Sequence, residues 1–181
     1  QRGECSDMTW VECLENLGST LYLNYPRLAL TVYEQILVLP VVPTSVWLVL
    51  GHLQDQLGQR RLAVESLLRV LQSAEASPQH VLKAANLLVR VGDQALALSA
   101  ATSAFEAMGR PSEHATTLLY IAQQTAHWPL AQVLTEQLQQ AYVTNAMTGI
   151  KESPRSHLLW CGDEAINLFV IKAWARQNLR T

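Results

Sequence analysis

The sequence predicts an all-α protein, an α-solenoid of four helix-turn-helix repeats closed by a C-terminal capping helix. Three observations predict it: a 34-residue internal repeat, helical spacing of apolar residues, and prolines that interrupt no helical pattern. The predicted repeats span residues 10–43, 44–77, 78–111 and 112–145, and residues 146–181 form a tail. Because one helix pair cannot bury its apolar face alone, each repeat must stack on the next.

The 34-residue step is clearest in a Leu-Ala dipeptide that recurs four times without slippage. Its alanines are Ala29, Ala63, Ala97 and Ala131. They fall one turn into each second helix, where a small residue lets two helices approach closely, so we expect them at the helix crossing. A second column with the same step holds small or apolar residues, namely Leu17, Gly51, Ala85 and Leu119.

Each repeat contains two helical patterns, best seen at 44–57 and 60–73, where apolar residues recur every three or four positions. Gly58 lies between these two patterns, Gly92 is its equivalent one repeat later, and Asn24 one repeat earlier. We expect these residues to end their helices in the left-handed conformation. The fourth repeat has Ala126 where glycine is expected.

Prolines support the same boundaries, since a proline at a helix start loses no hydrogen bond. We expect first helices to start at Pro43, Pro78 and Pro111, second helices at Pro26 and Pro129, and connections at Pro40 and Pro154.

The tail leaves the repeat register, because Gly149 and Pro154 break any continuous helix. Asp163 or Gly162 then caps a helix that runs to about Asn178. Its amphipathic stripe consists of Ile166, Phe169, Val170, Ala173 and Trp174. We expect this helix to cover the last repeat, although it could instead lead into a following catalytic domain.

On these features the chain resembles the tetratricopeptide-repeat family over residues 10–145. The second repeat carries the W-x-x-L-G opening as Trp47, Leu50 and Gly51, followed by Gly58 and Ala63. The third repeat lacks the Trp and the large aromatic residue, and the fourth is the most divergent. The resemblance implies a right-handed solenoid whose first helices line a concave, ligand-holding groove.

Composition excludes several classes of protein. The chain has 181 residues, a formal net charge of −2, 49% hydrophobic residues and only 15% charged residues. It is therefore not disordered, and without a Lys/Arg run it has no nucleic-acid footprint. The most apolar stretch, 36–50, holds two prolines and is too short to insert into a membrane. So few charges suggest that part of the surface is covered by something else.

Three cysteines, Cys5, Cys13 and Cys161, form no complete disulfide framework and no zinc spacing. We read them as free thiols of a reduced compartment, which makes the cytoplasm the expected location. The chain begins at Gln1 rather than Met and stops at Thr181, so we expect it to be a piece of a longer protein.

No enzyme signature is present, and no cofactor or metal is expected. The best catalytic candidate is the segment 157–163, which places His157, Cys161 and Asp163 within seven residues. Catalytic Cys and His residues are usually far apart in sequence, so a packed loop followed by a helix cap is the better interpretation.

Helix phase selects the groove residues that are not needed to contact the partner helix. The predicted groove residues are Leu14 and Tyr22 in the first repeat, Leu48, His52 and Asp55 in the second, Leu82, Asn86 and Arg90 in the third, and Tyr120 and Gln124 in the fourth. Apolar anchors with interspersed polar groups fit an amphipathic helix or an extended peptide. The leucines could instead pack between neighbouring first helices. We expect Trp10, Trp47 and Trp128 to be core or inter-repeat residues.

The sequence therefore predicts a non-catalytic protein-interaction module that binds a protein or peptide partner in the groove. Two alternatives stay open: an accessory domain of a larger enzyme such as a glycosyltransferase, and a self-associating scaffold, since low charge and exposed apolar faces favour homo-oligomers.

Overall fold

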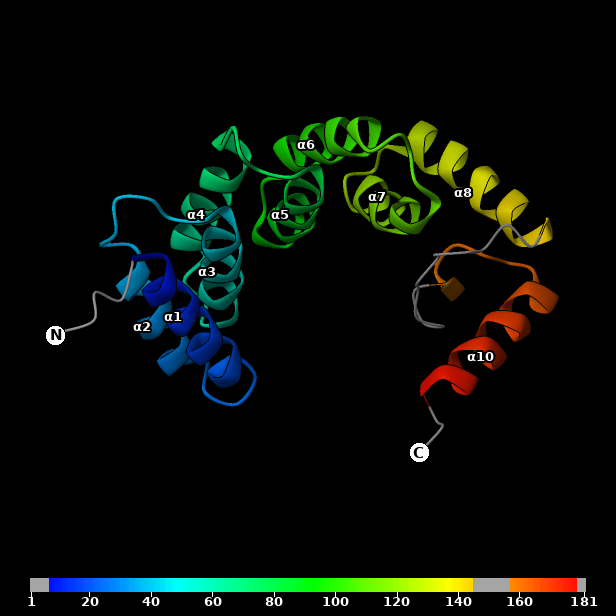
Figure 1. The fold of residues 1–181 in the computed structure, drawn as a ribbon. Coiled ribbons are helices and arrows are strands. Elements are labelled where there is room, and N and C mark those ends of the chain that lie inside the picture. Colours follow the sequence, from blue (N-terminus) through cyan, green and yellow to red (C-terminus); the bar gives the residue numbers. More distant parts are fainter. Residues whose placement is uncertain (1–6, 145–156, 179–181) are drawn as a thin grey trace, which may run out of the picture. The chain divides into compact units, whose positions relative to one another are not determined.

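The structure is a computed structural model that describes residues 7–144 and 157–178 (Figure 1). Within these ranges all regular secondary structure is helical, which confirms the all-α prediction. The helices are α1 (Asp7–Leu21), α2 (Pro26–Ile36), α3 (Thr44–Gln56), α4 (Arg60–Gln72), α5 (Pro78–Val91), α6 (Gln94–Ala107), α7 (Ser112–Gln124), α8 (Trp128–Val143) and α10 (Glu164–Asn178). Each predicted repeat thus holds one helix pair.

The chain divides into two compact units, Gln1–Ala104 and Phe105–Thr181, and the boundary falls inside α6. In the first unit helices pack against their neighbours in sequence: α1 on α2, α2 on α3, α3 on α4 and α4 on α5. The successive first helices α3 and α5 also touch. In the second unit α7 packs on α8.

Three of the four turns inside the helix pairs have one hydrogen-bond pattern. The backbone N–H groups of Gln59, Asp93 and His127, 34 residues apart, each donate to the carbonyl five residues earlier, at 2.8, 3.1 and 2.8 Å. The preceding residue is left-handed in each case, with φ of 76° at Gly58, 113° at Gly92 and 53° at Ala126. This Schellman-type closure satisfies carbonyls that the helix end leaves unpaired. The prediction for the two glycines is confirmed.

The first repeat closes its turn differently. The Tyr25 N–H donates to Leu21 only four residues back, at 2.7 Å, and Asn24 has no positive φ, so the prediction for Asn24 is wrong. The spacing between the small residues at the helix crossing is also one residue shorter, since Gly18 and Ala29 are 11 positions apart whereas Gly51 and Ala63 are 12 apart. The register of α1 therefore moves by one position: Gly18 is buried against Tyr33, and Leu17 is 49% exposed.

The alanine column lies where the paired helices are closest. Ala29, Ala63 and Ala97 are fully buried and Ala131 is 5% exposed, as predicted. On the facing helix, a Cβ added at Gly51 would lie 2.7 Å from Leu67 Cγ and 3.4 Å from the Ala63 carbonyl oxygen. Small residues on both helices therefore permit the close crossing.

Apolar side chains from α1, α2 and α3 form a continuous core in the first unit. It contains Leu14, Tyr33, Ile36, Leu50 and Leu53, among others. Two tryptophans expected in the core lie outside it, since Trp10 is 52% and Trp128 is 64% exposed, whereas Trp47 is half-buried. Both exposed tryptophans lie near helix starts, where helical spacing alone does not say which residues a neighbour covers.

The tail helix begins where it was predicted to begin. The Asp163 carboxylate accepts hydrogen bonds from the N–H groups of Ala165 and Ile166, at 2.8 and 3.0 Å, and so caps α10. Of the predicted stripe, Val170 is buried while Phe169 is 48% exposed. Gly149 and Pro154 lie outside the described residues. None of the described helices is long and apolar enough to span a bilayer.

Replacing Ala126 by glycine is expected to raise the free energy of unfolding by about 1 kcal/mol, because glycine removes the strain of a left-handed alanine. Urea denaturation followed by circular dichroism measures this change. The matched control is Ala95→Gly, an exposed position in the first turn of α6. There glycine should lower stability by up to about 1 kcal/mol. If both substitutions raised the free energy of unfolding, or both lowered it, the conformational explanation would be contradicted.

Gly51→Ala is expected to lower the free energy of unfolding by about 1–3 kcal/mol, because the new methyl group overlaps Leu67. Alanine has the better helix propensity, which would raise stability. Any loss of stability is therefore due to the close helix crossing. Thermal and urea unfolding of Gly51→Ala, Leu67→Ala and the double variant form a double-mutant cycle. We expect the double variant to lose less than the sum of the two single losses, and strict additivity would refute the contact.

Candidate interaction surface

Four of the predicted groove residues come together on one side of the first unit. They are Tyr22, just after α1, His52 and Asp55 on α3, and Arg90 on α5. The Tyr22 hydroxyl and His52 Nδ1 share a hydrogen bond, and their rings stack with centroids 5.5 Å apart. Arg90 Nη2 lies 3.0 Å from Asp55 Oδ2 in an ion pair. These four side chains are called the polar cluster below.

The polar cluster places a histidine with a lowered pKa beside a charged pair. Burial, and secondly the positive charge of Arg90, hold the pKa of His52 below its usual value, against a smaller opposite effect of Asp55. The Asp55 side chain is only 12% exposed whereas that of Arg90 is 48% exposed. Arg90 therefore neutralises a mostly buried carboxylate and still presents donors to solvent.

Two further predicted groove residues lie on the same helix faces. Leu48 is four residues before His52 on α3, and Asn86 is four residues before Arg90 on α5, so each shares a face with its partner in the polar cluster. Both are half-buried. Asn86 Oδ1 is buried and accepts no hydrogen bond from any described residue.

Leu14 and Leu82 lie in the core, with exposures of 8% and 3%, so they present nothing to a partner. For Leu14 the reason is the register shift of α1, which turns Glu15 to the surface instead, where its carboxylate accepts a hydrogen bond from Ser45 at 3.0 Å. Leu82 is covered because α5 packs against both α3 and α4. These two leucines have the packing role that the sequence left open.

Tyr120 and Gln124 belong to the second unit and lie one turn apart on α7. Tyr120 is half-buried and Gln124 is exposed. Their spacing places them on one face of that helix.

The His157–Asp163 segment is a packed loop. His157 is fully buried, and its ring meets the rings of Tyr142 and Trp160 edge-on, at 4.9 and 4.6 Å. The Asp163 carboxylate caps α10, and the Cys161 thiol lies 4.0 Å from the Asp163 carbonyl oxygen. The observed contacts of His157 and Asp163 are those of a packed ring and a helix cap. No described group of three or more His, Cys, Asp or Glu residues is arranged to hold a metal ion.

Sequence reasoning did not foresee the pairing of Trp47 with Arg69, whose guanidinium lies 5.9 Å from the centre of the indole ring. The two residues are 22 positions apart on different helices. No local pattern encodes such a contact, because it depends on how α3 and α4 are rotated about their axes.

No family model matches the chain, and no curated protein matches it.

The polar cluster should make stability depend on pH through His52. Because the pKa of His52 is lower in the folded state, the unfolded chain binds more protons near pH 6. The His52 contribution is therefore complete above the unfolded pKa of about 6.5 and is lost as the pH falls below that value. Urea unfolding between pH 5 and 8 should show this loss in the wild type and a smaller loss in His52→Gln.

Tyr22→Phe is the control for this measurement. It keeps the ring stacked on His52, and with it the burial that is the larger cause of the lowered pKa. The pH dependence should therefore persist in Tyr22→Phe. An unchanged pH dependence in His52→Gln would assign the effect to other groups.

Proposed function

We propose that the chain is a tetratricopeptide-type solenoid that acts as a non-catalytic protein-interaction module. Its binding surface is the side of the first unit formed by the polar cluster together with Leu48 and Asn86. The observation that carries this proposal is the convergence of side chains from three successive repeats on one partly exposed surface. Four helix pairs with a 34-residue step and a recurring turn support the repeat architecture.

The chemistry of this surface suits a peptide segment with mixed character. Leu48 and the Tyr22 ring offer apolar contact, and Arg90 offers charged donors. A carboxylate or carbonyl oxygen of a bound segment would accept hydrogen bonds from the exposed Arg90 guanidinium. An amphipathic helix or an extended segment supplies such groups next to apolar anchors.

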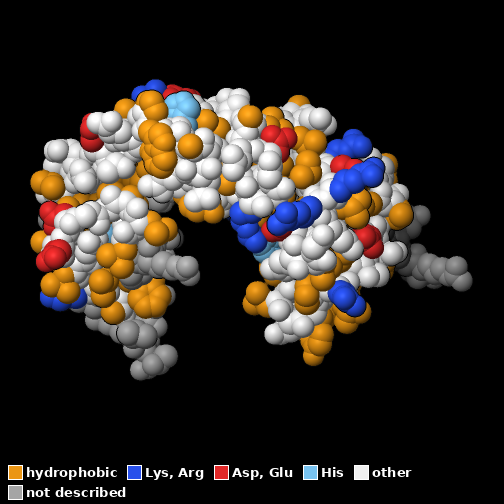
Figure 2. Space-filling model, turned by 180° about the vertical axis from the view of Figure 1, so that it is seen from behind, with side chains coloured by type: hydrophobic (Ala, Val, Ile, Leu, Met, Phe, Trp, Pro, Cys, Tyr) orange, Lys and Arg blue, Asp and Glu red, His pale blue; other side chains and the backbone are white. Residues whose placement is uncertain are grey.

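Self-association is a second candidate function, favoured by exposed apolar side chains. On α10, Leu168, Phe169, Ile171 and Trp174 are 39–51% exposed. Figure 2 shows one face of the molecule, where charged side chains gather in a few small groups and apolar ones are exposed between them. Light scattering at several concentrations separates a self-associating scaffold from a monomeric binder.

The double variant Leu48→Glu, Arg90→Gln should lose a partner that the wild type retains, because it removes one apolar and one cationic contact. Affinity capture from native extract finds the partner, and titration calorimetry with the purified partner measures the affinity. We expect binding at least about tenfold weaker, which corresponds to about 1.4 kcal/mol. Far-UV circular dichroism checks that the double variant is folded, because Arg90 also neutralises the mostly buried Asp55 carboxylate.

The matched control is Gln59→Glu, Arg60→Gln, which makes the same charge changes at exposed positions next to the start of α4. It should bind like the wild type. If both double variants bound the partner with equal affinity, the binding site would lie outside the polar cluster.

A further inference from the structure

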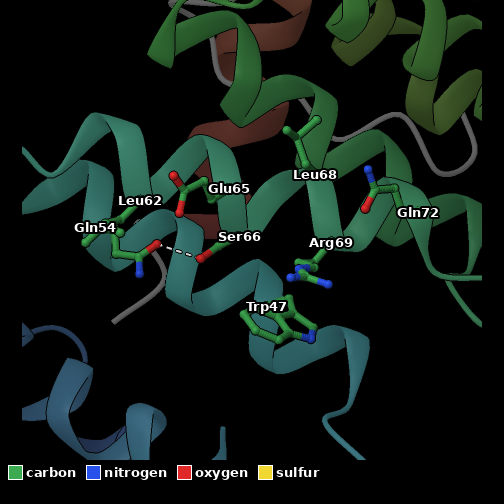
Figure 3. A pocket seen from close by; sticks show the side chains of 8 residues that line it. All are labelled: Trp47, Gln54, Leu62, Glu65, Ser66, Leu68, Arg69 and Gln72. Atoms are coloured by element: carbon green, nitrogen blue, oxygen red, sulfur yellow. Dashed lines mark hydrogen bonds between the residues drawn. The ribbon is translucent and has the colours of Figure 1, made fainter.

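A pocket of about 510 Å³ opens on a different side of α3, between α3 and α4 (Figure 3). From α3 it is lined by Trp47 and Gln54, which are seven residues apart and therefore share one helix face. The polar cluster uses another face of α3, that of His52 and Asp55. The pocket is thus a separate site in the same unit.

The pocket has a fixed wall and an aromatic surface. Ser66 Oγ donates a buried hydrogen bond of 2.7 Å to Gln54 Oε1, which ties α4 to α3 inside the pocket (Figure 3). Arg69 lies over the Trp47 ring, with the guanidinium carbon 5.9 Å from the ring centre. Trp47 is half-buried, so part of its surface stays open to a ligand.

Two charged residues line the pocket, Glu65 and Arg69, both on α4. The Glu65 carboxylate is paired with Arg61, which lies outside the pocket lining, at 3.1 Å. Arg69 has no carboxylate partner among the described residues. An anionic group would therefore find an uncompensated guanidinium next to an aromatic ring.

The shape of the pocket suits a chain segment. Along α4 the lining runs from Leu62 to Gln72, which corresponds to about 15 Å of helix at 1.5 Å per residue. An extended peptide covers that length with four or five residues at about 3.3 Å each. Leu62, which is 45% exposed, adds apolar area at the end of the lining opposite Gln72.

We propose that this pocket docks an acidic segment of a partner protein. A carboxylate of the segment binds the Arg69 guanidinium, and an apolar or aromatic side chain of the segment packs on Trp47 and Leu62. The site is distinct from the polar cluster, so it gives the chain a second peptide-binding surface and does not depend on the proposed function of the first.

The test uses a panel of capped octapeptides in a serine–glycine background. Each peptide combines one phenylalanine with two glutamates at varied spacing, and a second panel has lysine in place of each glutamate. Binding to the full chain is followed by the indole N–H signal of Trp47 in NMR spectra, assigned with Trp47→Phe. We expect glutamate peptides to shift this signal at millimolar concentration or below, and their affinity to fall as salt is raised.

Two single-charge variants decide whether Arg69 recognises the peptide. Arg69→Gln should bind at least tenfold more weakly, while Arg60→Gln, which removes an exposed charge outside the pocket on the same helix, should bind like the wild type. Arg69→Lys should bind with intermediate affinity, because it keeps the charge without the planar donor pair.

Three results would overturn the proposal. They are an unmoved Trp47 signal with every glutamate peptide, equal binding of the lysine panel, and equal weakening by Arg69→Gln and Arg60→Gln. The last result would show attraction to the general positive charge of α4. Circular dichroism checks that each variant is folded, and both arginines are exposed, so neither substitution disturbs the core.

Discussion

The close crossing of paired helices is the constraint on which the rest of the structure depends. At this crossing an alanine of the second helix is buried in every repeat, and in the second repeat Gly51 leaves no room for a methyl group beside Leu67. Because the helices meet so closely, the rotation of each helix about its axis is determined. That rotation decides which side chains enter the core and which are presented to solvent.

Both candidate sites are consequences of the rotation of α3. One face of this helix carries Leu50 and Leu53 into the core, a second presents His52 and Asp55, and a third places Trp47 beneath Arg69. This one short helix therefore contributes side chains to the core and to two different surfaces. The surfaces differ in chemistry: the first has a histidine of lowered pKa next to an ion pair, and the second an arginine without an acidic partner among the described residues.

The first repeat shows how a small change in a turn reassigns a whole helix. The other three turns contain a left-handed residue and close over five residues, whereas the first turn closes over four. The one-residue difference turns α1 by about 100° relative to the repeat register. It buries Leu14 and Gly18, exposes Leu17, and brings Tyr22 to His52. Residues that are 34 positions apart in the sequence therefore do not have the same environment in every repeat.

The sequence by itself determined the helix pairs, their boundaries and the left-handed turns at Gly58 and Gly92, because these features depend on local backbone preferences and a fixed 34-residue step. It also identified four residues of the polar cluster, since helix phase predicts which side chains share a face. Only the tertiary structure decided that Leu82 is buried, that Trp10 and Trp128 are exposed, and that Arg69 covers Trp47. Those outcomes depend on how closely and at what rotation neighbouring helices pack, which no local pattern records.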